Sequence, residues 1–408
     1  MRQKRVITLI TVFLLCTVPV WAQTKVITRD TRSDATNNKT NAPRWAYKDE
    51  YSEGLARVED HRGKWGFVDQ TGKVVIPCKW KFAGDFHDGL AKVEDENGKY
   101  GCVDKTGALV IPCNWGYVYD FIGEYALVYD EEKRRGLIDR TGKEIIPCEW
   151  KSVGPDPDYK YPPFSEGMAR VRDLDGKYGF VDTAGKVVVP PTWKYAYDFS
   201  EGLAKVEDDH EKYGFVDKTG KLVIPCKWSA ASGFSCGLSW VRDWKAPERV
   251  GNASISSTGY GFIDKTGNLV VPVKYDDAFM FSEGMARVKL NKKYGFIDST
   301  GKEIIPFEYE DARDFCEGLA KIMLDGKWGF VDKTGNVIIP CKYEDARSFN
   351  EGLACVKDNG KYGFVDKTGG LVIPCIWNTA KDFKDGRARV YNDKYEEMYI
   401  DKTGKVVK

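Results

Sequence analysis

The stretch Trp65-Gly66-Phe67-Val68-Asp69-Gln70-Thr71-Gly72 decides the fold, because the phrase returns throughout the chain. Its aspartate occurs at ten positions, separated by 35, 35, 43, 35, 47, 34, 34, 34 and 35 residues. These positions are Asp69, Asp104, Asp139, Asp182, Asp217, Asp264, Asp298, Asp332, Asp366 and Asp401. Similarity at a period of this length is typical of repeat proteins, whose units pack against their neighbours. The sequence therefore predicts ten units of about 35 residues.

Each unit carries three short apolar segments, at 54–58, 65–69 and 74–76 in the first unit. β-branched and aromatic residues between glycine and aspartate punctuation favour strands, so we expect an all-β unit of three antiparallel strands. We expect Pro77 to end the third strand, because proline cannot donate a hydrogen bond to a neighbouring strand.

The segment between the second and third strands predicts a hairpin built on a type I turn. Aspartate bonds its own backbone in such a turn, and glycine supplies a positive φ two or three residues later. We assign this structural role to Asp69, Gly72, Asp104, Gly107, Asp332 and Gly335.

Two aromatic columns accompany the repeat. One stands three residues after each proline, at Trp80, Trp115, Trp150, Trp193, Trp228, Tyr275, Tyr309, Tyr343 and Trp377. The other is a phenylalanine, at Phe86, Phe121, Phe164, Phe199, Phe234, Phe281, Phe315, Phe349 and Phe383. Three short strands cannot bury these side chains alone, so we expect them to stack between units.

The predicted architecture is an open β array or superhelix, with a closed β-propeller as the alternative. Ten units exceed the usual four to eight blades, and the chain has whole units at both ends rather than strands to share. The third unit departs most from the repeat, with Glu124, Arg135 and Leu137 at positions that otherwise hold glycine, an aromatic residue and phenylalanine.

Phrases such as Lys327-Trp328-Gly329-Phe330-Val331-Asp332-Lys333-Thr334-Gly335-Asn336-Val337-Ile338-Ile339-Pro340 resemble the WG, or KWG, repeat family over residues 52–408. The resemblance implies a bacterial-type β-repeat array with no family-wide enzymatic activity or known ligand. The tryptophan of the motif is often tyrosine here, at Tyr100, Tyr178, Tyr213, Tyr260, Tyr294 and Tyr362.

The N-terminus predicts export. Residues 1–22 combine a basic start, an apolar stretch and a small-residue cleavage site ending at Ala22, as in a secretory signal peptide. Leu15 before Cys16 does not fit a lipoprotein signal, and no later segment is apolar enough to span a membrane as a helix.

We therefore expect a signal peptide at 1–22, a flexible polar linker at 23–48 and repeats at 49–408. Insertions near 151–163 and 243–258 should form loops. The expected location is the periplasm, the cell surface or the medium.

The composition argues against a nucleic-acid partner. Without the three basic residues of the signal peptide, 59 basic residues face 61 acidic ones, whereas nucleic-acid binding needs an excess of positive charge. Basic residues that precede the motif aromatic could form a surface stripe, but interleaved acids favour a solvated face. They are Lys64, Lys99, Arg134, Lys177, Lys212, Lys293, Lys327 and Lys361.

No residue pattern predicts catalysis, a metal or a cofactor. The three histidines, His61, His87 and His210, fall in different units, whereas a catalytic triad or metal cluster needs convergent groups. The turn aspartate supplies too few oxygens for calcium, which takes six to eight. An enzyme remains a third hypothesis only through the two insertions.

Because the protein is expected to be exported, the ten cysteines beyond the signal peptide could be either disulfide-bonded or free thiols. Six follow the repeat proline, at Cys78, Cys113, Cys148, Cys226, Cys341 and Cys375. Other units hold Pro191, Val273 or Phe307 at that position, so it accepts apolar volume. We favour buried free thiols over disulfides, because successive units lie too far apart for a bridge.

Repetition without catalytic chemistry favours a non-catalytic scaffold that binds a protein or peptide of the cell envelope. The alternative is a glycan-binding surface protein that uses exposed tryptophan and tyrosine. Exposure of the column that begins at Trp80 discriminates the two, because buried rings cannot stack on a sugar.

Overall fold

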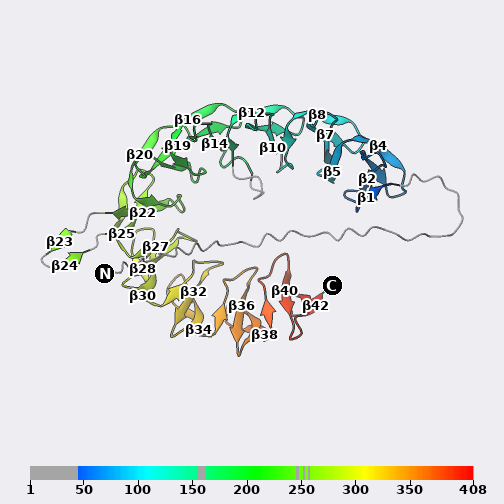
Figure 1. Cartoon of the computed structure of the whole chain (residues 1–408). Helices are drawn as coiled ribbons and strands as arrows, with labels where there is room; N and C mark the ends of the chain where they lie inside the picture. The colour runs from blue at the N-terminus through cyan, green and yellow to red at the C-terminus, as the bar shows by residue number, and fades with distance from the viewer. Residues whose placement is uncertain (1–44, 155–161, 245–247, 251–252, 256–257, 408) are drawn as a thin grey trace, which may run out of the picture. The chain divides into compact units, whose positions relative to one another are not determined.

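The computed structural model describes residues 45–154, 162–244, 248–250, 253–255 and 258–407. The described chain contains ten four-stranded antiparallel sheets that follow one another in chain order (Figure 1). The all-β class and the ten units are confirmed, but each sheet has four strands, not the predicted three. No helix of the described residues is long and apolar enough to cross a membrane.

The strands fall into four classes by their place in the sheet. The short first strands are β1 (Tyr47–Lys48), β5 (Phe82–His87), β9 (Tyr117–Val118), β13 (Ser152–Val153), β17 (Tyr195–Ala196), β21 (Ala230–Ala231), β27 (Asp277–Ala278), β31 (Asp311–Ala312), β35 (Asp345–Ala346) and β39 (Thr379–Ala380). The second strands are β2 (Leu55–Glu59), β6 (Leu90–Glu94), β10 (Tyr125–Tyr129), β14 (Met168–Arg172), β18 (Leu203–Glu207), β22 (Leu238–Trp244), β28 (Met285–Leu290), β32 (Leu319–Leu324), β36 (Leu353–Asp358) and β40 (Arg387–Tyr391).

The third strands carry the motif aromatic in most sheets. They are β3 (Trp65–Asp69), β7 (Tyr100–Asp104), β11 (Arg135–Asp139), β15 (Tyr178–Asp182), β19 (Tyr213–Asp217), β25 (Thr258–Asp264), β29 (Lys293–Asp298), β33 (Lys327–Asp332), β37 (Lys361–Asp366) and β41 (Glu397–Asp401). The fourth strands are β4 (Val74–Trp80), β8 (Leu109–Trp115), β12 (Glu144–Trp150), β16 (Val187–Trp193), β20 (Leu222–Trp228), β26 (Leu269–Tyr275), β30 (Glu303–Tyr309), β34 (Val337–Tyr343), β38 (Leu371–Trp377) and β42 (Val406–Val407).

The strand absent from the prediction is the short first strand. In the first sheet it is Tyr47–Lys48, which pairs with β2 and lies in the segment expected to be linker. In later sheets it directly follows the fourth strand of the preceding sheet, as β5 follows β4. Apart from the six-residue β5, this strand has only two residues. Two residues show no periodicity, so the sequence pattern gave no signal for the strand.

The repeat proline does not end the fourth strand, contrary to the prediction. β4 continues through Pro77 to Trp80, because it is an edge strand and bulges: Phe67 faces Ile76, whereas Trp65 faces Trp80. The bulged backbone passes over Gly66, where an added Cβ would lie 2.5 Å from the Ile76 carbonyl oxygen. The glycine of the motif is therefore required by a close backbone approach.

Turn length explains why the repeat interval changes from 35 to 34 residues. In the first sheet five residues connect the second and third strands, and Asp60 Oδ1 accepts hydrogen bonds from the backbone N–H of Arg62 and Lys64, both at 2.9 Å. In the eighth sheet a two-residue turn replaces it, with positive φ at both Asp325 and Gly326. The seventh and ninth sheets have the same short turn. The turn is three residues shorter and each flanking strand is one residue longer, so each of these intervals loses one residue.

The insertion near 243–258 is only partly a loop. The strands β22 and β25 are extended, and β23 (Glu248–Val250) and β24 (Ala253–Ile255) form a separate hairpin between them. In the other insertion, residues 155–161 lie outside the described residues, as do the proposed signal peptide and the linker up to residue 44.

The core lies between successive sheets. Phe67 of the first sheet meets Phe86 of the second edge to face, with ring centroids 4.8 Å apart. Leu55 and Trp80 pack in the same cluster against Ala91 and other residues of the second sheet. Equivalent phenylalanine pairs recur at six further junctions. Each sheet therefore completes its core with the next one, as expected for a repeat protein.

A polar ladder also connects each of six sheets to the next. Glu53 occupies a two-residue turn and accepts hydrogen bonds from Gly89 N at 3.1 Å and Lys105 Nζ at 2.9 Å, both in the next sheet. Equivalent glutamates pair with lysines one sheet on: Glu166 with Lys218, Glu201 with Lys265, Glu283 with Lys333, Glu317 with Lys367 and Glu351 with Lys402. We call this set the Glu–Lys ladder.

Two junctions lack both partners of this ladder. Between the third and fourth sheets, Gly123 stands at the glutamate position and Thr183 at the lysine position. Between the sixth and seventh sheets, Cys236 and Ser299 stand there. Loss of the acid and the cation together supports the pairing, because either charge alone would lack its partner.

Candidate binding surface

The aromatic column proposed from the sequence is mostly buried. Seven of its nine residues are less than a tenth exposed, and Trp115 and Trp193 are half-buried. Trp80 packs with Ala83 and Phe86 of the next sheet, and the equivalent residues pack likewise. The hypothesis of glycan stacking on this column thereby loses its main support.

The turn residues act within their own hairpins. Asp69 Oδ1 accepts hydrogen bonds from Thr71 N, Thr71 Oγ1 and Lys73 N at 2.9, 2.6 and 3.0 Å. The aspartates at 104 and 332 make the same contacts with the residues two and four positions later. The glycines at 72, 107 and 335 have φ values of 82°, 86° and 91°. Three donors thus occupy one oxygen, which explains the aspartate without a cation.

The histidines lie apart on the surface. His61, His87 and His210 are exposed, each in a different sheet. Among the described residues, no group of three or more histidine, cysteine, aspartate or glutamate side chains could hold a metal ion.

The ten cysteines beyond the signal peptide are free thiols. The six that follow a repeat proline are half-buried in the bulge, and burial raises the pKa of each. Cys102 and Cys355 are buried between sheets, and desolvation raises the pKa of each to about 12. A raised pKa keeps a thiol protonated and poorly reactive.

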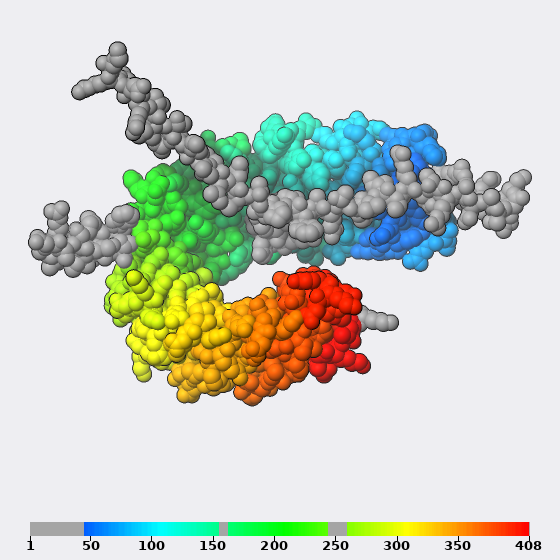
Figure 2. Space-filling view, turned by 60° about the horizontal axis from the view of Figure 1, so that its bottom comes forward, coloured from blue at the N-terminus to red at the C-terminus, as the bar shows by residue number. Residues whose placement is uncertain are grey.

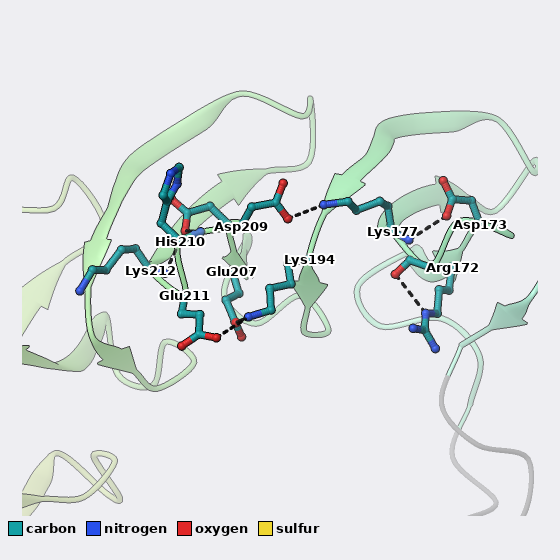
Figure 3. Close-up of polar contacts among 11 residues, drawn as sticks. Arg172, Asp173, Lys177, Lys194, Glu207, Asp209, His210, Glu211 and Lys212 are labelled. Carbon is teal, nitrogen blue, oxygen red and sulfur yellow. Dashed lines mark hydrogen bonds and ion pairs between the residues drawn. The ribbon is translucent and has the colours of Figure 1, made fainter.

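The basic stripe pairs in part with acids of the next sheet. Lys177 meets Asp209 of the next sheet (Figure 3). Lys194, which is outside the stripe, pairs with Glu207 and Glu211 of its own sheet. The pairs Lys64–Glu96, Lys99–Glu131 and Lys361–Asp393 repeat the first contact. These pairs favour the solvated-face interpretation over a polyanion site.

A second row of cations, which the sequence analysis did not single out, lies between the sheets. Arg57 Nη1 donates to the Ala83 carbonyl of the next short strand at 2.8 Å and lies over the Trp65 ring. Lys205 donates to the Ala231 carbonyl at 2.7 Å and lies 3.8 Å from the Tyr197 ring centroid. Burial lowers the pKa of Lys205. These cations therefore hold adjacent sheets together.

Tyrosines gather beside the short strands of the second to fifth sheets. The first tyrosine patch is Tyr100, Tyr117, Tyr119 and Tyr129; the second is Tyr178, Tyr195, Tyr197 and Tyr213. Tyr117 stacks on Tyr129 with centroids 5.6 Å apart, and Tyr178 lies 4.7 Å from Tyr195. All eight are half-buried except Tyr195, which is 39% exposed.

Charged groups surround both patches. Tyr100 donates a hydrogen bond to Glu94 at 2.9 Å. Burial of Tyr100, together with this hydrogen bond, raises the pKa of Tyr100 to about 12. Lys92 lies over the Tyr117 ring at 4.3 Å, and Asp120 is exposed beside it. Half-buried tyrosine with polar neighbours combines apolar area with hydrogen-bonding groups, as protein interfaces do. Only the spacing of aromatic residues around each short strand could have indicated the patches from sequence.

The fold and surfaces together define a class of protein: an all-β repeat protein whose successive sheets share their core. The chain belongs to the WG containing repeat family, which matches residues 65–100, 100–133, 136–178, 178–209, 213–243, 260–294, 294–328, 328–362 and 362–395. The resemblance inferred from the sequence is thereby confirmed. No curated protein matches the chain.

Solved structures show only a distant likeness. The chain is similar to the computationally designed Ika8 protein, with 12% identity, a TM-score of 0.32, and coverage of 71% of this chain and 93% of the other. It is also similar to BamB from Moraxella catarrhalis, with 12% identity, a TM-score of 0.29, and coverage of 71% and 94%. TM-scores this low support no argument about function.

Proposed function

We propose that this protein is an exported, non-catalytic scaffold that binds a protein or peptide of the cell envelope through the two tyrosine patches. The observation that carries the proposal is the gathering of eight tyrosines with charged neighbours on otherwise repetitive sheets. Tyrosine is enriched at the energetic centres of protein interfaces.

The packing of the patches favours a protein over a glycan. A sugar stacks on an open ring face, but Lys92 covers Tyr117, and Arg172 lies 5.2 Å from the centroid of Tyr178. Ring edges and hydroxyl groups remain for contact, which suits a polypeptide surface. Glycan binding is therefore the second candidate, supported only by the partial exposure of residues such as Tyr195.

The test is capture of partners from the native envelope by the immobilised protein, with cross-linking and mass spectrometry. The variant Tyr117→Ala/Tyr195→Ala should lose the captured partner, whereas Tyr395→Ala, an exposed tyrosine of the last sheet, should keep it. Equal capture by all three proteins would refute the role of the patches. Release of the partner by free oligosaccharides, but not by peptide competitors, would support the glycan alternative.

Export rests on residues 1–22, which lie outside the described residues. N-terminal sequencing of protein recovered from the envelope should give a mature start at Gln23. An uncleaved N-terminus in cytoplasmic protein would contradict export.

We further infer an open array of sheets. Closure of a propeller is most secure when the first and last blades share strands. Each described four-stranded sheet, including β1–β4 and β39–β42, instead uses strands that are neighbours in sequence, apart from the hairpin inserted in the sixth. Small-angle scattering tests this inference.

A further inference from the structure

The last sheet differs from the other nine at the positions that normally contact a following sheet. In the ninth sheet, Leu353 and Phe364 are buried in a cluster with Phe383 and Ala388 of the tenth. The corresponding residues of the tenth sheet are Arg387 and Tyr399, which are both exposed. The first of these positions is leucine, methionine or tyrosine in all other sheets.

A third substitution adds another charge to the same face. Ser52 donates to the Phe86 carbonyl of the next sheet at 2.7 Å, and four other sheets repeat this serine contact. Lys384 takes this position in the tenth sheet and is exposed. Apolar and small residues that join sheets have thus been replaced by long cations and a tyrosine.

These residues line a hollow of about 790 Å³ on the last sheet. The last sheet is the red end of the chain in Figure 2. The lining of the hollow is Lys381, Asp382, Lys384, Asp385, Arg387, Arg389 and Tyr399. Asp382 lies 3.8 Å from Arg347, and Arg389 lies 3.6 Å from Glu397. Within the described part of the chain, Lys381, Lys384 and Arg387 form no ion pair.

The chemistry of the hollow selects a particular kind of anion. Three unpaired cations, including a guanidinium that binds carboxylate in a bidentate manner, favour a ligand with more than one negative group. Asp382 and Asp385 would repel a simple inorganic anion but accept hydrogen bonds from backbone N–H groups. Tyr399 adds an exposed ring, and the volume exceeds the needs of one small ion. A peptide that carries carboxylates meets all of these conditions.

We propose that this hollow binds an acidic peptide segment of a partner protein, with Lys381, Lys384 and Arg387 as the carboxylate-binding residues. The site is separate from the tyrosine patches and does not depend on their role. A polar face that only keeps the end of the stack soluble would explain the same substitutions without a ligand. Binding of a defined peptide separates the two explanations.

The experiment uses the protein purified after expression of the whole chain. A rhodamine-labelled (Gly-Glu)5 peptide is added, and its binding is measured by fluorescence anisotropy at low salt. The wild type should bind this peptide and not (Gly-Gln)5. The variant Lys384→Gln/Arg387→Gln, which keeps the face polar, should bind at least about tenfold more weakly. Its melting temperature should equal that of the wild type, because neither side chain is packed.

The matched control is Lys221→Gln/Lys302→Gln, which removes the same charge from exposed lysines of other sheets. This control should bind like the wild type, and so should Tyr117→Ala, which separates this site from the proposed function. Absence of binding by the wild type, or equal weakening in both double variants, would overturn the proposal. Binding of tripolyphosphate but not of the peptide would overturn the assignment to an acidic peptide.

Discussion

Two glycines of each motif are required for different physical reasons. Gly335 has a φ of 91°, whereas Gly329 lacks space, because an added Cβ would lie 2.4 Å from the Ile339 carbonyl oxygen. Gly329 is therefore tied to the bulge of the partner strand.

Both glycines should be costly to replace, and unequally so. Gly335→Ala places a Cβ at a positive φ, 3.4 Å from the Ile304 carbonyl oxygen, and should cost about 1 kcal/mol. Gly329→Ala must displace backbone and should cost more, on the order of 2–3 kcal/mol. Urea denaturation followed by circular dichroism measures both. Gly352→Ala, at a positive φ with no atom within 4 Å of the added Cβ, is the control for the positive φ alone. An unfolding midpoint for Gly329→Ala at or above that of Gly335→Ala would contradict this account.

The elements differ in how far sequence reasoning could predict them. The second and third strands and the turn at Asp69 follow from residue types whose preferences act locally. The short first strand and the bulge at Pro77 depend on pairing with residues elsewhere in the sheet, so local preference did not reveal them. The tyrosine patches were missed for the same reason, since their members come from adjacent sheets.

The Glu–Lys ladder should stabilise each junction that contains it. The variant Cys236→Glu/Ser299→Lys restores both charges between the sixth and seventh sheets, where Cys236 already has the φ of 53° that glutamate adopts elsewhere. We expect a stabilisation of up to about 1 kcal/mol, seen as a higher melting temperature at low salt. Each single variant should stabilise the protein less than the double variant, because its new charge lacks a partner. A double variant no more stable than the sum of the singles would show that the ladder contributes nothing.

Acid should weaken many units together. The Thr334 hydroxyl lowers the pKa of Asp332, and the hydrogen bonds from Lys367 and Gly352 outweigh burial and lower the pKa of Glu317. Carboxyls with a lowered folded-state pKa stabilise the fold above their unfolded value of about 4, and this contribution is lost as the pH falls below it. The melting temperature should therefore be flat between about pH 5 and 8 and fall below about pH 4.

The buried thiols set the upper pH limit of this stable range. Burial raises the pKa of Cys102 and Cys355 to about 12, so their contribution is present below the unfolded pKa of about 8.5 and is lost as the pH rises above it. Thermal melts from pH 3 to 10 measure both limits. A steady fall in melting temperature from pH 7 to 5 would contradict the assignment to carboxylates.

Scattering in solution decides between an open array and a closed ring. A compact chain of about 386 residues should have a radius of gyration near 21 Å. Ten sheets stacked at roughly 10 Å each would extend for about 100 Å, with a radius near 30 Å. Curvature shortens such an array, so an intermediate radius with an asymmetric distance distribution still fits it. A radius close to 21 Å with a globular distribution, measured on monodisperse monomer, would instead require the first and last sheets to meet.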